Sequence, residues 1–248
     1  MQIDPTIFKA YDVRGIYPTQ INAEIAYAIG RAYATFLPEK MGAKTRVVVG
    51  GDMRLSTPEL KSELIRGLLE SRMDIEDVGL LATPTLYFAT GSLGYDGGIQ
   101  VSASHNPKEW NGFKFVAHRG VPISKDSGLM KIKEIIETDA FMPVSTQAKG
   151  NLIKKENVLA SAVKEFTKDI PQPERILKIA IDPGNGMGGI DMKALFATLP
   201  HTVVWMNEEP DGTFPVHEAD PMVPENTHDL QEKILAEQCD LGIAIDGD

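Results

Sequence analysis

The run GGIQVSASHNP, residues 97–107, decides how this chain folds. Its apolar first half, residues 97–101, predicts a short buried strand. Its second half places a hydroxyl, an imidazole and an amide on one loop, and open α/β sheets bind their ligands at the carboxyl ends of strands. We therefore predict a ligand site at Ser104 and His105. An ordinary turn is the alternative interpretation, because Ser and Asn bond local backbone and Pro fixes φ.

Short β-branched segments and amphipathic segments alternate on both sides of this run. The pattern predicts strands at residues 46–50, 75–80 and 113–116, and helices at residues 22–37, 56–69, 83–90 and 127–137. Asn22 is available as the N-cap of the first helix. Short strands interleaved with amphipathic helices are typical of a layered α/β domain.

Apolar periodicity is lost over residues 138–151, which predicts a linker and two domains, residues 1–150 and 151–248. The second domain repeats the alternation, with predicted helices at residues 158–166 and 226–238 and strands at residues 177–181, 201–206 and 241–245. A glycine-rich turn, residues 182–189, resembles a phosphate-cradling turn in outline, but its spacing fits neither a P-loop nor a dinucleotide fingerprint. We favour a structural role for these glycines. The fold class we expect is α/β, with two consecutive layered domains and mixed sheets.

The charge balance and composition limit the possible partners. The 248 residues carry 35 acidic and 25 basic side chains, a net charge of −10, which works against nonspecific binding to nucleic acid or to anionic membranes. No apolar run approaches the roughly 20 residues that span a bilayer. A single cysteine excludes an internal disulfide framework. We expect a soluble, cytoplasmic protein whose partner is a small molecule.

Asp246 and Asp248 flank a glycine directly after an apolar strand. Continued strand geometry would direct both carboxylates the same way, as a hard cation such as Mg²⁺ requires. Two carboxylates are too few for octahedral coordination, so a further carboxylate or a phosphate is expected. A solvated acidic turn is the alternative.

Arg14 lies in the irregular run YDVRG, where its guanidinium could bind a phosphate through two hydrogen bonds; a surface ion pair with Asp12 is the alternative. Asp52 and Arg54 are expected to pair across a turn that shapes the site. In an extended loop Ser104 and His105 would point to opposite sides, which argues against a hydrolase-like Ser/His pair. A phosphorylated serine would supply the missing metal ligand and would be neutralised by Mg²⁺, Arg14 and Lys114. Ser102 would face the same side as Ser104, so spacing leaves open which serine is modified.

Four motifs in this order resemble the α-D-phosphohexomutase family, in its phosphomannomutase/phosphoglucomutase branch. They are YDVRG at residues 11–15, SASHNP with NGFK at residues 102–107 and 111–114, DGTFP at residues 211–215, and DGD at residues 246–248. The resemblance implies that Ser104 is the phosphoserine. It also implies that Asp246 and Asp248 are two of three Mg²⁺-binding aspartates, with the Ser104 phosphate as a further ligand.

The same resemblance implies that Arg14 lies near the transferred phosphoryl group, that Lys114 is the general base or acid, and that His105 shapes the loop or contacts phosphate. Family members have four domains, and this chain matches the first and most of the second. The third aspartate and its arginine have no counterpart here, so we expect the fragment alone to be inactive and sugar choice to stay open.

We therefore expect a phosphohexomutase that interconverts the 1- and 6-phosphates of mannose or glucose through a hexose 1,6-bisphosphate. Two other functions fit parts of the pattern. One is an aspartate-dependent phosphatase of the haloacid-dehalogenase kind, which also has an Asp-x-Asp after an apolar strand. The other is a noncatalytic fragment that binds sugar phosphates. The phosphorylation state of Ser104 and the oligomeric state cannot be derived from the sequence.

Overall fold

The strand predicted at residues 97–101 lies inside a mixed sheet of the first α/β unit. The computed structural model describes residues 3–38, 44–144 and 149–248, and within them this sheet has the order β1-β5-β4-β2-β3-β7, with β6 paired to β5. Its strands are β1 (Val13–Ile16), β2 (Arg46–Gly51), β3 (Asp74–Leu80), β4 (Gly97–Val101), β5 (Trp110–Ala117), β6 (Val121–Pro122) and β7 (Leu152–Lys154). Strands β4, β2, β3 and β7 run parallel, whereas β5 is antiparallel to β4, β1 and β6.

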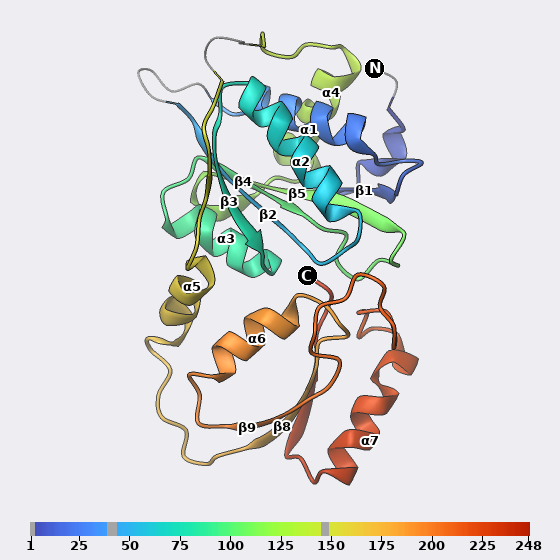
Figure 1. Ribbon diagram of the computed structural model, residues 1–248, viewed down its shortest axis with the longest axis vertical. Helices are drawn as coiled ribbons and strands as arrows, with labels where there is room; N and C mark the ends of the chain where they lie inside the picture. Colours follow the sequence, from blue (N-terminus) through green and yellow to red (C-terminus); the bar gives the residue numbers. More distant parts are fainter. Residues whose placement is uncertain (1–2, 39–43, 145–148) are drawn as a thin grey trace.

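Helices cover both faces of this sheet, as Figure 1 shows. On one side lie α1 (Ala23–Phe36), α2 (Thr57–Glu70) and α4 (Met130–Glu137); on the other lies α3 (Thr83–Ser92). Side chains of β2 alternate between the two cores: Val47 and Val49 pack with α1 and α2, and Val48 packs with α3. The side chain of Asn22 accepts a hydrogen bond from the Ile25 amide, which confirms the predicted N-cap.

The predicted helix at residues 127–137 begins later than expected. Residues Lys125–Leu129 form a π-helical turn, and Gly128 has a φ of 155°, outside helical geometry. Regular α-helix therefore starts at Met130. The short 3-10 helices are Pro5–Ile7, His118–Gly120 and Pro224–Thr227.

The second unit is a smaller, wholly parallel sheet of order β10-β8-β9. Its strands are β8 (Lys178–Asp182), β9 (Thr202–Trp205) and β10 (Leu241–Ala244), and its helices are α6 (Gly188–Phe196) and α7 (His228–Ala236). These two helices lie on opposite sides of the sheet, and α5 (Val158–Thr167) lies between α3 and α6 (Figure 1). The two layered α/β units confirm the predicted fold class. Every helix in the described part of the chain is too short or too polar to span a bilayer.

Strand β7 extends the first sheet beyond residue 150. Ile75 of β3 pairs with Leu152, so the residues that follow the predicted domain boundary still belong to the first sheet. Part of the predicted linker, residues 145–148, lies outside the described residues. The boundary itself stays a prediction.

The loops after β4 and β10 meet between the two units, where Figure 1 places the end of the chain. The contact is close: a Cβ built on Gly247 would lie 2.7 Å from the Ser104 carbonyl oxygen. Only a residue without a side chain fits there. The fold therefore brings the two polar motifs of the sequence together.

Candidate active site

The loop after β4 holds Ser104 in a conformation that L-residues rarely adopt. Ser104 has a φ of 57°, and its amide donates to the Ser102 hydroxyl at 3.0 Å. Ser102 is fully buried, whereas Ser104 lies at the surface of the site with 6% of its area exposed. The two serines are thus not equivalent: Ser102 supports the backbone of the loop, and Ser104 presents its hydroxyl to the second unit.

Arg54 holds this loop in place through hydrogen bonds to its backbone. Its buried guanidinium donates to four backbone carbonyl oxygens, those of Ser104, Asn106, Pro107 and Trp110, at 2.6–2.9 Å. Asp52 lies 3.2 Å away, which confirms the predicted pair. Burial raises the pKa of Asp52 and lowers that of Arg54, because both charges are removed from water. Arg54 therefore supports the site without reaching its surface.

Ser104, His105 and Asp246 converge on one point. The Ser104 hydroxyl lies 2.9 and 3.0 Å from the two carboxylate oxygens of Asp246, to which it can donate, and His105 Nδ1 lies 3.3 Å from Ser104 Oγ and 3.2 Å from Asp246 Oδ2. The prediction that Ser104 and His105 point to opposite sides is wrong, because the left-handed backbone at Ser104 interrupts the alternation. Serine and aspartate meet the same imidazole nitrogen, so the arrangement is no hydrolase relay, which uses both nitrogens.

Lys114 and Arg14 are organised around Asp12, whose carboxylate is buried. Asp12 Oδ2 lies 2.7 Å from Arg14 Nε and 3.6 Å from Lys114 Nζ, and its other oxygen has no hydrogen-bond partner. Arg14 also donates to the Asn106 side chain at 2.7 Å. The Asp12–Arg14 pair is therefore not a surface ion pair. Sequence analysis missed this anchoring role of Asp12.

Asp246 and Asp248 have different partners. Asp246 is 41% exposed at its side chain and meets Ser104, whereas Asp248 is 8% exposed, accepts from Thr83 Oγ1 at 2.7 Å and lies 3.5 Å from Lys114 Nζ. Strand β10 ends at Ala244, so strand alternation does not govern these side chains. Lys114 and Asp248 thus connect the cluster around Asp12 to the loop that carries Asp246.

The donor set fits a hard divalent cation. Asp246, Asp248 and a phosphorylated Ser104 would supply only oxygen atoms, which Mg²⁺ prefers. Among the described residues, one group of three possible ligands lies elsewhere, at His228, Asp229 and Glu232 on α7. All three are exposed, and such clusters are common without an ion.

The DGTFP loop also contacts the first unit. A Cβ on Gly212 would lie 2.6 Å from the Met53 carbonyl oxygen, and the Phe214 ring lies 5.2 Å from the Arg54 guanidinium carbon. This cation–π contact places the loop beside the residue that fixes the serine loop. The motif therefore helps to join the two units.

His217 and Asp182 form a further polar pair, which lies in the second unit. His217 Nε2 lies 3.1 Å from Asp182 Oδ2, and its Nδ1 lies 2.9 Å from the Glu218 carbonyl oxygen. Burial lowers the pKa of His217, but these two acceptors outweigh it, so the pKa is raised. The pair supports the loop whose Ala219 carbonyl accepts the Gly247 amide at 3.1 Å.

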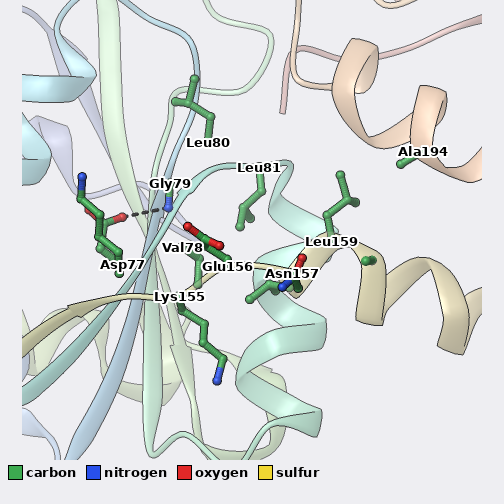
Figure 2. Close-up of a pocket in the computed structure, with 13 residues that line it drawn as sticks. Asp77, Val78, Gly79, Leu80, Leu81, Lys155, Glu156, Asn157, Leu159 and Ala194 are labelled. Atoms are coloured by element: carbon green, nitrogen blue, oxygen red, sulfur yellow. Dashed lines mark hydrogen bonds between the residues drawn. The ribbon is translucent and has the colours of Figure 1, made fainter.

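A cavity of about 640 Å³ lies away from this chemistry. Figure 2 shows it between the end of β3, the start of α5 and Ala194 of α6. None of its lining residues belongs to the predicted site. The cluster around Ser104, rather than this hollow, has the convergent polar groups that mark a reactive site.

Comparison with known proteins identifies the family. Models of phosphoglucomutase/phosphomannomutase α/β/α domain I and domain II match residues 5–142 and 159–248. The chain belongs to the phosphoglucomutase/phosphomannomutase family.

Several relatives cover almost the whole chain. A phosphomannomutase of Escherichia coli is 41% identical over 250 residues, and a phosphomannomutase/phosphoglucomutase of Pseudomonas syringae pv. tomato is 40% identical over 244. Each match covers 98% of this chain, and 54% and 50% of these relatives. A crystal structure of a family protein from Burkholderia thailandensis superposes with a TM-score of 0.90 at 36% identity, covering 100% of this chain and 54% of that one. The chain thus spans about half the length of these relatives.

Proposed function

We propose that the protein carrying this chain moves a phosphoryl group between the 1 and 6 positions of a hexose phosphate, with mannose or glucose as the sugar. The observation that carries the proposal is the contact between units: Ser104 Oγ lies 2.9 Å from Asp246 while Arg54 fixes the serine backbone. The names of the E. coli and P. syringae relatives support the reaction class. Because the chain spans half their length, we expect turnover to need the full-length protein.

In the proposed cycle, Ser104 enters as a phosphoserine. The bond between Ser104 Oγ and phosphorus breaks as the free sugar hydroxyl forms a new bond to phosphorus, which gives a hexose 1,6-bisphosphate. The proton that the sugar hydroxyl loses passes by way of Lys114 to the leaving Ser104 oxygen, so that the serine is left as a neutral hydroxyl. After the bisphosphate reorients, its other phosphate returns to Ser104 Oγ, and the proton that the serine gives up passes back by way of Lys114 to the released sugar oxygen. No oxidant or further reactant is needed.

Charge stabilisation is the main contribution that proteins make to phosphoryl transfer. Arg14, which Asp12 and Asn106 hold in position, would bind a phosphoryl oxygen. His105 orients the loop and contacts the phosphate. A bound Mg²⁺, held by Asp246, Asp248 and the phosphoserine, would neutralise charge on the transferring oxygens.

Replacement of Ser104 tests the proposal. In the full-length protein, Ser104→Ala should lower the rate of conversion of hexose 1-phosphate to hexose 6-phosphate by more than about 10³-fold, because the carrier oxygen is removed. Phosphorus NMR follows both sugar phosphates, and exposed Ser62 on α2 provides the control variant Ser62→Ala. Near-normal conversion by Ser104→Ala would end the proposal.

A further inference from the structure

The N-terminus of α3 lacks a cap from its own unit. Its N-cap residue is Ala82, whose side chain has no polar atom, and no side chain at that position accepts a helix amide. A helix start leaves backbone N–H groups without intrahelical partners, and a buried one is costly. The first turn of α3 therefore needs an acceptor from outside.

Asp191 of the second unit is that acceptor. Its Oδ1 accepts the Ala82 amide at 3.3 Å, and its Oδ2 accepts the Thr85 hydroxyl. Asp191 is 7% exposed, and burial raises its pKa. A carboxylate at a helix N-terminus also interacts favourably with the helix dipole. Asp191 thus does for α3 what the acidic residue of a capping box does within one helix.

The surroundings of this contact are largely apolar. An apolar cavity of about 110 Å³ lies beside Asp191, between α3, α5 and α6. Its lining includes Pro84, Leu159, Phe166 and Met192. Hydrogen bonds in such surroundings are stronger than in water. The contact therefore joins the two units at a defined position.

Asp191 is also connected to the loop that carries Asp246 and Asp248. The residue before α6, Met187, donates its amide to the Gly247 carbonyl at 3.1 Å. A Cβ on Gly188, the first residue of α6, would lie 2.9 Å from the Ile245 side chain. The start of α6 thus packs against the loop, and Asp191 lies one turn later on the same helix.

Other polar contacts between the units involve the groups that the proposed reaction uses. Ser104 meets Asp246, and Lys114 meets Asp248. The contact between Ser104 and Asp246 must change when the serine carries a phosphoryl group, because the hydroxyl proton that Asp246 accepts is then absent. The bonds of Asp191 to Ala82 and Thr85 contain none of the reacting groups, so they can persist through the cycle.

We propose that Asp191 is a positioning residue: by capping α3 across the unit boundary, it sets the position of Asp246 and Asp248 relative to Ser104. This inference rests on the proposed function for its catalytic consequence. Its structural part, that Asp191 controls the placement of the loop, is independent of activity.

The test compares Asp191→Ala, which removes both acceptors, with Asp191→Asn, which keeps one. Exposed Glu134 on α4 provides the control Glu134→Gln. In the full-length protein, Asp191→Ala should raise amide exchange at Gly247 about tenfold and weaken Mn²⁺ binding, measured by calorimetry, by about tenfold. It should lower kcat by about 10²-fold with little change in KM, as expected when reacting groups are displaced by about 1 Å. Asp191→Asn should give intermediate values.

Unchanged exchange at Gly247 and unchanged Mn²⁺ affinity in both variants would overturn the inference. If Asp191→Ala does not fold, amide exchange at Gly247 and Mn²⁺ affinity are measured on Asp191→Asn, and unchanged values there overturn the inference. A purely structural role would lower stability in both variants without changing Mn²⁺ affinity or kcat. A wild-type protein without mutase activity would refute the proposed function, while the exchange result would still decide whether Asp191 positions the loop.

Discussion

The two loops that meet at the candidate site are held in different ways. The serine loop rests on a buried guanidinium that binds four of its carbonyl oxygens. The aspartate loop has backbone bonds to Ala219, Met187 and Asp182, and its Asp246 side chain is 41% exposed. The difference indicates a rigid support for the serine that we propose to react and an adjustable position for the Asp246 carboxylate that faces it.

The two units that carry these loops also differ, in how deeply their strands are buried. Strand β4 of the first unit is buried along its whole length, whereas no residue of β9 or β10 is fully buried. Both large apolar clusters among the described residues lie in the first unit, reaching the second only as far as Val158. The first unit therefore supports its loop by itself, and the second depends more on contacts across the boundary.

The largest effect is expected from removal of the guanidinium beneath the serine loop. Arg54→Met should lower the free energy of unfolding by about 3–5 kcal/mol, because it leaves the buried Asp52 carboxylate unpaired and four carbonyl oxygens without donors. Urea denaturation measures the change. Arg66, which is 49% exposed and pairs with Glu63, provides the control Arg66→Met. Equal losses of unfolding free energy in Arg54→Met and Arg66→Met would contradict the conclusion that Arg54 supports the serine loop rigidly.

A methyl group between the two loops should have a smaller effect on stability. Gly247→Ala places a Cβ 2.7 Å from the Ser104 carbonyl oxygen, so the aspartate loop must move. We expect a loss of about 1–3 kcal/mol in unfolding free energy and a loss of about 10²-fold in kcat. Gly91→Ala, near the C-terminal end of α3, is the control for kcat; its Cβ would lie 3.2 Å from the Arg119 carbonyl oxygen, so a loss of stability is expected there too but no loss of kcat. If Gly247→Ala left kcat unchanged, the close contact would not matter for transfer.

The smallest effect concerns pH. The pKa of His217 is raised in the folded protein, so its interaction with Asp182 is fully present below the unfolded value of about 6.5 and is lost as pH rises through the folded value. Wild type should therefore lose unfolding free energy over that window, by less than about 1 kcal/mol relative to His217→Gln. Denaturation between pH 5 and 9 tests this, with exposed His228 replaced as the control. If the stability advantage of wild type over His217→Gln grew as pH rises, the result would contradict a raised pKa of His217 in the folded protein.

Much of the fold could be predicted because burial follows the periodicity of the side chains. The alternation of Val47, Val48 and Val49 between two cores is one example. Strand β7 could not be predicted, because all three of its residues are exposed and its pairing with β3 is made by backbone atoms. The π-helical turn before α4 was also not predicted.

The candidate site was predicted as a set of residues, but not in its geometry. Short motifs and their resemblance to a known family indicated Ser104, Asp246 and Lys114, although Lys114 lies in strand β5 and not on a loop. The left-handed backbone at Ser104 has no sequence signal, and it is the reason that His105 shares a side with the serine. In the sequence, Asp191 cannot be distinguished from other acidic residues of helices. Its hydrogen bond with Thr85 exists only because the two units pack together.

The central claim is that Ser104 carries a phosphoryl group, and intact mass measures this most directly. After incubation with a hexose 1,6-bisphosphate, the wild-type protein should gain about 80 Da, the mass of one phosphoryl group, and fragmentation should assign it to Ser104. Ser102→Ala should keep the added mass, and Ser104→Ala should lose it. No gain in mass, or a phosphoryl group assigned to Ser102 or to an aspartate, would contradict the account.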